Sequence, residues 1–274
     1  MTENQPFFGK RKDTDKGILV VSFGTSYPET REKTIDKIEE EIQKACPDFA
    51  VYRAWTSGMI IRKILKRDGI RIFTVTEAME QMRLDGIQEV VVQPTHVLNG
   101  IENDQMIQDA MAFEKDFGRI VFGSPLLTSQ EDNERVIQAV TEEMPLKEDE
   151  ALVFMGHGTT HFANSIYAAL DYQFKDRGYK NIFMGTVEAY PSMESLMKLV
   201  RQNSPRRVIL APFMIVAGDH ASNDMSGEED SWKAEFEAAG FQVECRMKGL
   251  GEYPEIRRIF IDHVQDAVQT GMSK

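Results

Sequence analysis

The stretch of sequence that decides the fold is Phe154-Met-Gly-His-Gly-Thr-Thr160, an apolar run that ends in a histidine between two glycines. Two more apolar runs end in a polar side chain, in Gly185-Thr-Val-Glu-Ala-Tyr-Pro191 and in Val216-Ala-Gly-Asp-His-Ala221. The spacings from His157 to Glu188 and from Glu188 to His220 are 31 and 32 residues, and one strand with its crossover helix takes about 30 residues. The three side chains are therefore expected to follow three buried strands at the same edge of one parallel sheet.

Open α/β sheets bind their ligands beyond the carboxyl ends of the strands, where these three side chains should converge. Two imidazole nitrogens and one carboxylate oxygen suit Co²⁺, Ni²⁺, Zn²⁺ or Fe²⁺ better than Ca²⁺ or Mg²⁺. Three protein ligands also leave a coordination position open, as a catalytic or transfer site requires. Taken singly, each histidine also fits a structural role, and Glu188 fits a charge at a helix N-terminus. Their conjunction favours a shared metal site formed by His157, Glu188 and His220.

Three other polar residues, Asp219, His161 and His96, receive simpler interpretations. Asp219, next to His220, is expected to fix the tautomer of an imidazole by a hydrogen bond. His161 stands four residues after His157, but the glycines on both sides of His157 favour a turn, so we place His161 outside the ligand set. His96 is interpreted as a packed or hydrogen-bonded structural residue.

Strand-like and helical segments alternate from Gly17 onward, which predicts parallel sheets covered by helices on both faces. The two halves of the chain also resemble each other. Ser22-Phe-Gly-Thr-Ser26 aligns with Gly156-His-Gly-Thr-Thr160 at an offset of 134 residues. The segment 91–100 aligns with 209–218 at an offset of 118, and an extra helix at Glu77–Leu84 is expected to account for the difference. We interpret the pattern as an internal duplication.

The duplication predicts a flexible N-terminal tail (residues 1–16) and two similar α/β lobes, each a parallel sheet flanked by helices, with a cleft between them. The boundary is placed in the acidic stretch Glu142–Glu150, which gives lobes of residues 17–145 and 146–274, and the last helix is allowed to pack on the first lobe. At the offset of 118, Glu102 is the counterpart of His220, and at the offset of 134, Phe23 is the counterpart of His157. The first lobe would then offer an apolar wall and one acid, and the second lobe the metal site.

Composition and motif searches exclude several classes of function. The formal charge of −12 argues against a nucleic-acid-binding surface. The N-terminus lacks the apolar core of a signal peptide, and no apolar run approaches the roughly 18 residues of a membrane span. With only Cys46 and Cys245 as cysteines, a cytoplasmic protein without a membrane partner is expected. Neither a P-loop nor a dinucleotide fingerprint is present, so no organic cofactor is expected. Homo-oligomerisation stays open.

Six segments form a pattern that is more specific than the triad: Leu19-Val-Val-Ser-Phe-Gly-Thr-Ser-Tyr27, Trp55-Thr-Ser-Gly-Met-Ile-Ile-Arg-Lys63, Val153-Phe-Met-Gly-His-Gly158, Val187-Glu-Ala-Tyr-Pro191, Val216-Ala-Gly-Asp-His-Ala-Ser-Asn-Asp-Met225 and Gly249-Leu-Gly-Glu252. Together they resemble the anaerobic sirohydrochlorin cobaltochelatases, ATP-independent class II chelatases of the early cobalt-insertion route to cobalamin. The resemblance extends from about Gly17 to Gln269.

This resemblance implies a chelatase fold of two lobes with the tetrapyrrole held in the cleft between them. It also implies that His157, Glu188 and His220 bind the incoming Co²⁺, and that Glu102 matches an acidic residue of the opposite lobe. Ile101 stands where the family has an acidic residue, which argues against a role for two carboxylates at this turn.

Insertion of a divalent metal into a free-base ring requires removal of metal-bound water and of two pyrrole N–H protons. His157, His220 and Glu102 are the candidate catalytic residues, because a histidine or glutamate near the ring nitrogens can act as general base. The loop Phe23, Gly24 and Thr25 and the segment with Ser124 and Leu126 are expected to hold the ring. Arg53 and Arg62 are the candidate anchors for its carboxylates.

The leading hypothesis is therefore a sirohydrochlorin cobaltochelatase, a lyase, that places Co²⁺ in the free-base tetrapyrrole without ATP and releases two protons. Ni²⁺, Fe²⁺ or Zn²⁺ are the expected substitutes for Co²⁺. One alternative is a chelatase that inserts iron or nickel into sirohydrochlorin. Alternatives of other classes are a metallohydrolase with two histidines and a glutamate as ligands, and a carrier of metal or tetrapyrrole without catalytic activity.

Overall fold

The computed structural model describes residues 14–272, which divide into two compact units. Unit 1 contains residues 14–128 and 257–272, and unit 2 contains Ser129–Ile256. Most of the expected N-terminal tail, residues 1–13, lies outside the described residues, and the first strand already begins at Lys16. No helix in the described part of the chain is long and apolar enough to cross a membrane.

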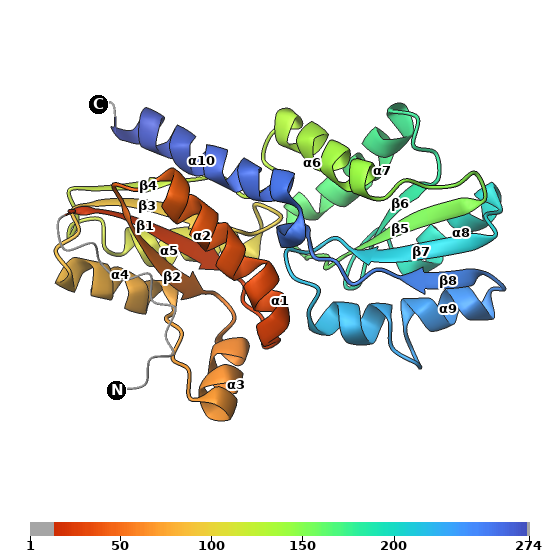
Figure 1. The fold of residues 1–274 in the computed structure, drawn as a ribbon, viewed down its shortest axis with the longest axis horizontal. Helices are drawn as coiled ribbons and strands as arrows, with labels where there is room; N and C mark the ends of the chain where they lie inside the picture. Colours follow the sequence, from red (N-terminus) through yellow and green to blue (C-terminus); the bar gives the residue numbers. More distant parts are fainter. Residues whose placement is uncertain (1–13, 273–274) are drawn as a thin grey trace. The chain divides into compact units, whose positions relative to one another are not determined.

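Unit 1 is built on a sheet of four parallel strands in the order β2-β1-β3-β4 (Figure 1). The strands are β1 (Lys16–Ser22), β2 (Ala50–Trp55), β3 (Glu89–Pro94) and β4 (Arg119–Phe122). The helices that follow one another in the first part of the chain are α1 (Pro28–Lys33), α2 (Ile35–Ala45), α3 (Gly58–Asp68), α4 (Val75–Leu84) and α5 (Ile101–Met111). Residues 257–272 of the last helix of the chain, α10 (Pro254–Met272), also belong to unit 1.

Unit 2 repeats this sheet in the order β6-β5-β7-β8, again with all strands parallel. Its strands are β5 (Glu150–Gly156), β6 (Ile182–Thr186), β7 (Arg207–Pro212) and β8 (Gln242–Cys245). Its helices are α6 (Gln130–Glu143), α7 (Ser165–Asp176), α8 (Met193–Asn203) and α9 (Trp232–Ala238), with short turns η1 (Phe162–Asn164), η2 (Ala221–Met225) and η3 (Leu250–Glu252).

Both sheets are covered on two faces, which explains why their central strands are apolar along their whole length. In unit 1, Leu19 and Val21 of β1 pack in one cluster with Met79 and Met82 of α4. Because side chains alternate along a strand, Ile18 and Val20 of the same strand face the other side of the sheet. In unit 2 the corresponding cluster joins β5 to α8 and α9, while Phe154 on the other face stacks on Phe174 of α7 with ring centroids 6.0 Å apart. The fold class predicted from the alternating pattern is thus confirmed.

The two offsets found in the sequence match whole strands. An offset of 134 carries β1 onto β5 from end to end, and an offset of 118 carries β3 onto β7 in the same way. The extra helix of the first half, however, is α3 and not the predicted segment Glu77–Leu84. That segment belongs to α4, which packs in the core as α8 does, whereas Ile64 is the one buried residue of α3.

The division of the chain differs from a single cut between residues 145 and 146. Helix α6 groups with unit 2, and residues 257–272 of α10 group with unit 1. Within unit 1, Arg257 Nε donates to Glu41 Oε1 at 2.8 Å and His263 Nδ1 lies 2.9 Å from the carbonyl oxygen of Ser124. These two polar contacts join residues 257–272 to unit 1, although unit 2 separates them from the rest of unit 1 along the chain.

Arg53, predicted as an anchor for substrate carboxylates, is instead part of the interior of unit 1. Its side chain is 4 % exposed, and its Nε donates to both carboxylate oxygens of Glu39 at 2.8 and 2.9 Å. A second ion pair joins its Nη2 to Asp36. The prediction was wrong because the guanidinium on β2 is neutralised by carboxylates of α2, which leaves it no charge to offer a ligand.

We expect Arg53→Met to lower the free energy of unfolding by about 3–5 kcal/mol, because it leaves a buried carboxylate without its partner. Urea denaturation followed by circular dichroism measures this loss. Arg83→Met is the matched control, since Arg83 pairs with Glu80 on the exposed face of α4 and its loss should change stability little. A folded, fully stable Arg53→Met protein would show that the ion pair does not hold α2 to the sheet.

Candidate metal centre

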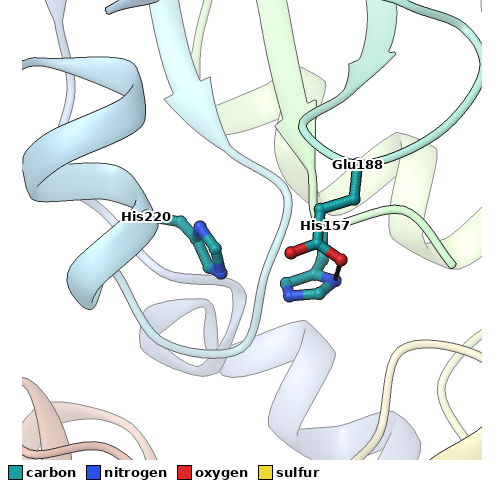
Figure 2. Close-up of side chains that lie close together, drawn as sticks. All are labelled: His157, Glu188 and His220. Carbon is teal, nitrogen blue, oxygen red and sulfur yellow. Dashed lines mark ion pairs between the residues drawn. The ribbon is translucent and has the colours of Figure 1, made fainter.

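The three side chains predicted to share a metal lie together at the carboxyl edge of the sheet of unit 2 (Figure 2). His157 directly follows β5, Glu188 follows β6 by two residues, and His220 precedes the π-helical turn η2 that comes after β7. One ligand atom from each lies within 4.8 Å of the other two. No other group of three such side chains occurs among residues 14–272, and the three predicted side chains are close enough together to hold a metal ion.

Backbone pairing beyond the strand ends brings the first two ligands together. The N–H of Val187 donates to the carbonyl of Gly156 at 3.0 Å, and the N–H of Glu188 donates to the carbonyl of His157 at 3.0 Å. The parallel register of β5 and β6 therefore continues into the loops. As a result, the separation of His157 and Glu188 is set by hydrogen bonds of the main chain.

Gly158 makes this close approach of the loops feasible. Its φ of +86° lies in the left-handed region, and a Cβ there would stand 2.9 Å from the backbone nitrogen of Ala189. Only glycine meets both conditions. In this conformation the carbonyl of Gly158 lies 2.7 Å from Nδ1 of His157, so the same residue that permits the turn also orients the imidazole.

The hydrogen bonds of the two imidazoles select their tautomers. A carbonyl or a carboxylate oxygen can only accept, so Nδ1 of His157 carries a proton toward Gly158 and Nδ1 of His220 carries one toward Asp224 Oδ2 at 2.8 Å. The lone pair of each neutral ring is then on Nε2, the form needed to bind a metal. Asp224 stands four residues after His220, a spacing that spans one helical turn and brings the two side chains together. The expectation that Asp219 fixes an imidazole tautomer stays a prediction.

The ligands are accessible from solvent. The side chains of His157, Glu188 and His220 are 38, 56 and 33 % exposed. The two imidazole rings meet edge to face with centroids 4.7 Å apart, and Nδ1 of His157 is 3.9 Å from Glu188 Oε2. An open set of two nitrogens and one oxygen, without thiolate, can take up and release a divalent ion, whereas structural zinc sites are closed by four ligands.

The candidate residues of unit 1 occupy the equivalent edge of its own sheet. Phe23 follows β1 and is 45 % exposed, whereas Thr25 is buried. Gly24 has a φ of +100°, and a Cβ there would lie 2.6 Å from the ring of Trp55, so it repeats the requirement seen at Gly158. Glu102 is half-buried in the first turn of α5. None of the predicted metal ligands belongs to this unit.

The remaining predicted substrate contacts, Arg62, Ser124 and Leu126, differ in their exposure to solvent. Arg62 is exposed on α3, and Ser124 is half-buried with its carbonyl accepting from Gln93 Nε2 at 2.9 Å. Leu126, predicted to touch the ring, is fully buried and therefore belongs to the core. Its apolar character gave no sign of which way it faces.

His161 lies outside the metal cluster, as predicted. Its Nδ1 accepts from the N–H of Ala163 at 3.2 Å, and its ring lies 4.1 Å from that of Phe162. The residue therefore caps the turn η1.

Sequence reasoning missed Asn164, which ties together the loops that carry His157 and Glu188. Its Oδ1 accepts from the N–H of Thr159 at 3.0 Å, and its Nδ2 donates to the carbonyl of Tyr190 at 2.6 Å. One amide thus bridges the two loops that present ligands. Nothing in the sequence marks this asparagine, because its partners are main-chain groups that any residue would supply.

We expect Asn164→Ala to weaken Co²⁺ binding about 10-fold while the protein remains folded, because groups that orient metal ligands contribute on this scale. Anaerobic titration with Co²⁺, followed by its visible absorption, measures the affinity. Asn203→Ala serves as control, since Asn203 donates only to the carbonyl of Leu199 at the end of α8. Equal affinities in all three proteins would contradict the bridging role of Asn164.

The chain is similar to known proteins over nearly its whole length. The family model described as "Cobalt chelatase (CbiK)" matches residues 16–269. The chain is 41% identical over 261 residues to the sirohydrochlorin cobaltochelatase of Salmonella typhimurium, a match that covers 94% of this chain and 98% of the relative. It is 33% identical over 260 residues to the sirohydrochlorin cobaltochelatase CbiKC of Nitratidesulfovibrio vulgaris, covering 93% and 91% of the two chains.

The fold has a solved counterpart in the sirohydrochlorin chelatase SirB of Bacillus subtilis subspecies spizizenii, determined in complex with cobalt. The TM-score is 0.64 at 14% identity, with 94% of this chain and 97% of that chain covered. At this identity the likeness concerns the fold alone. The full-length match to the family model and the two relatives above 30% identity establish more: this chain belongs to the cobalt chelatase family.

Proposed function

We propose that this chain is a sirohydrochlorin cobaltochelatase that inserts Co²⁺ into the free-base ring without ATP and with release of two protons. The observation that carries the proposal is the open triad of His157, Glu188 and His220 in a member of the cobalt chelatase family. The two relatives identified above are both named for this activity.

The character of the triad supports a metal that is a substrate and not a resident cofactor. The three side chains are solvent-accessible and include no thiolate. A metallohydrolase, by contrast, has to keep its metal through many turnovers. The order in which sites made of imidazole and carboxylate bind Co²⁺, Ni²⁺, Zn²⁺ and Fe²⁺ is set mainly by the metal. The choice of Co²⁺ therefore depends on which metal ions are available and on which of them the tetrapyrrole accepts.

In the proposed reaction, Nε2 of His157, Nε2 of His220 and one oxygen of Glu188 replace water molecules around Co²⁺. Gly158 and Asp224 keep the imidazoles in the tautomer that makes this possible. Part of the dehydration of the ion therefore takes place on the protein, before the ring nitrogens bind.

Two pyrrole N–H bonds must break before the ring can hold the metal as a dianion. We assign the acceptance of these protons, one after the other, to Glu102: its carboxylate forms an O–H bond as the first N–H bond breaks, passes that proton to water, and then takes the second. The exposed ring of Phe23, with the half-buried Ser124, is proposed to contact the macrocycle, whereas the predicted contacts Gly24 and Thr25 are buried. Arg62, exposed on α3, is the remaining candidate partner for its carboxylates. Arg53 and Leu126 are excluded by their burial.

We expect His157→Ala and His220→Ala each to lower the initial rate of Co²⁺ insertion at least about 100-fold, because each removes one of three ligands. The assay is anaerobic incubation with sirohydrochlorin and Co²⁺, with Fe²⁺ and Ni²⁺ in parallel, followed by absorption. His161→Gln is the matched control from the same loop and should retain activity. Failure of the wild-type protein to accelerate insertion of any metal would refute the proposed function, and active alanine variants would make the triad structural.

A further inference from the structure

Helix α3 carries a row of positive charges along its solvent face. Residues that follow one another at spacings of three and four share one face of a helix. In α3 the residues at these spacings are all exposed, and they are Met59, Arg62, Lys63, Lys66 and Arg67. We call the four cations among them the basic stripe. The one buried residue of the helix, Ile64, does not belong to this face.

The basic stripe is not balanced by carboxylates of the protein. Among residues 14–272, only Arg67 of the stripe has a salt bridge, to its neighbour Asp68 at 2.6 Å. The helix thus carries four positive charges and one negative charge, in a chain of formal net charge −12. The stripe contains two pairs of cations four residues apart, and like charges at this spacing destabilise a helix. Lys66 and Arg67 lie in the last turn, where cations are favourable. Arg62 and Lys63 have no such compensation, and an anionic ligand would supply it.

The sheet of unit 1 does not need α3. Unit 2 joins β6 to β7 through the single helix α8, whereas unit 1 joins β2 to β3 through α3 and α4. Of these two helices, α4 packs in the core as α8 does in unit 2. A helix with one buried residue adds little to the apolar area that holds the fold together. The presence of α3 therefore calls for a role of its exposed face.

Helix α3 begins at the carboxyl edge of the sheet, beyond the end of β2 and beside the loop of Phe23 (Figure 1). The N–H of Ser57 donates to the carbonyl of Phe23 at 3.2 Å, so the residue before the helix is paired with this loop. Nη1 of Arg62 lies 3.2 Å from the position that a Cβ on Gly58 would take. The guanidinium is thus folded back over the first turn, toward the edge. Phe23 and Met59, 45 and 75 % exposed, add apolar surface there.

We propose that the basic stripe binds the carboxylates at the rim of sirohydrochlorin and thereby selects rings that are rich in carboxylates. This inference rests on the proposed function. The macrocycle has apolar faces and an anionic rim, and the start of α3 offers apolar side chains beside a row of cations. The stripe extends the single candidate contact Arg62 into a surface that can pair with several carboxylates at once. Clustered charges also speed the association of a ligand of opposite charge.

The test removes two charges of the stripe in the double variant Lys63→Gln/Lys66→Gln, which keeps the helix because lysine and glutamine have similar helix propensity. We expect the Kd for sirohydrochlorin, measured without metal by quenching of protein fluorescence, to rise about 3–10-fold, since one exposed ion pair contributes a factor of up to about 5. The KM for the ring should rise in parallel. The KM for Co²⁺ should not change, because its ligands all belong to unit 2. Lys63→Arg/Lys66→Arg keeps both charges and should bind the ring as the wild-type protein does.

Lys37→Gln/Lys198→Gln is the matched control, because it removes the same number of charges from two other helices. Lys37 on α2 pairs with Glu40, and Lys198 on α8 pairs with Glu194. This control should bind sirohydrochlorin as the wild-type protein does. An unchanged Kd in Lys63→Gln/Lys66→Gln, or an equal rise in the control, overturns the inference.

A second measurement needs only the wild-type protein and decides the matter if the variants do not fold. The affinity should fall in the order uroporphyrin, coproporphyrin and mesoporphyrin, which carry progressively fewer carboxylates. The differences should shrink at high salt, because salt screens exposed charges. Equal affinities for the three rings, or an order that salt leaves unchanged, would overturn the inference. A wild-type protein that accelerates insertion of no metal refutes the proposed function instead, whatever the affinities for these rings.

Discussion

The hydrogen bond from the N–H of Glu188 to the carbonyl of His157 is the interaction on which the candidate metal site depends. It continues the register of β5 and β6 for one step beyond the strands. Because main-chain hydrogen bonds have narrow geometry, the Cα positions of two ligands are set by the sheet itself. Gly158 completes the arrangement, since any larger residue would push the two loops apart.

The same main-chain frame exists in unit 1 with other side chains. There the N–H of Ser57 donates to the carbonyl of Phe23 at 3.2 Å, and Gly24 takes the left-handed conformation that Gly158 has in unit 2. Phe23 and Ser57 thus stand where the ligands His157 and Glu188 stand in the other unit. A duplicated frame with substituted side chains allows one copy to bind a cation while the other keeps an apolar ring and a carboxylate for different tasks.

The strands and the grouping of His157, Glu188 and His220 were predictable from the sequence. Both depend on apolar runs and on the number of residues between them, which can be read along the chain. What was not predictable depends on contacts between distant segments. Arg53 is an arginine within an apolar run, and only the position of Glu39 on α2 decides that its charge is buried. The two offsets likewise showed that the first half is longer than the second between its first and third strands. They did not show that α3 is the added helix, because that depends on which helix packs in the core.

The partners of the ligands were the hardest to predict. Asp224 acts by one hydrogen bond to a ring nitrogen, and Asn164 acts by two hydrogen bonds to main-chain groups. Such bonds require only a polar side chain at a suitable place in a turn, and the sequence contains many of these. Asp224 was not singled out from the other acids near His220, although side chains four residues apart in a helical turn are neighbours.

In the proposed mechanism, the charge balance of the triad explains how the same site can bind Co²⁺ and then release it to the ring. Two neutral imidazoles and one carboxylate leave one positive charge on a bound Co²⁺. A ring that has lost two protons offers four nitrogens and two negative charges, which outweighs three protein ligands in number and in charge. Removal of the protons is therefore the step that makes transfer favourable, since metal ligands must be deprotonated before they bind. A free-base ring that keeps its protons competes poorly with the three side chains, so in the proposed mechanism the groups that accept the pyrrole protons control insertion.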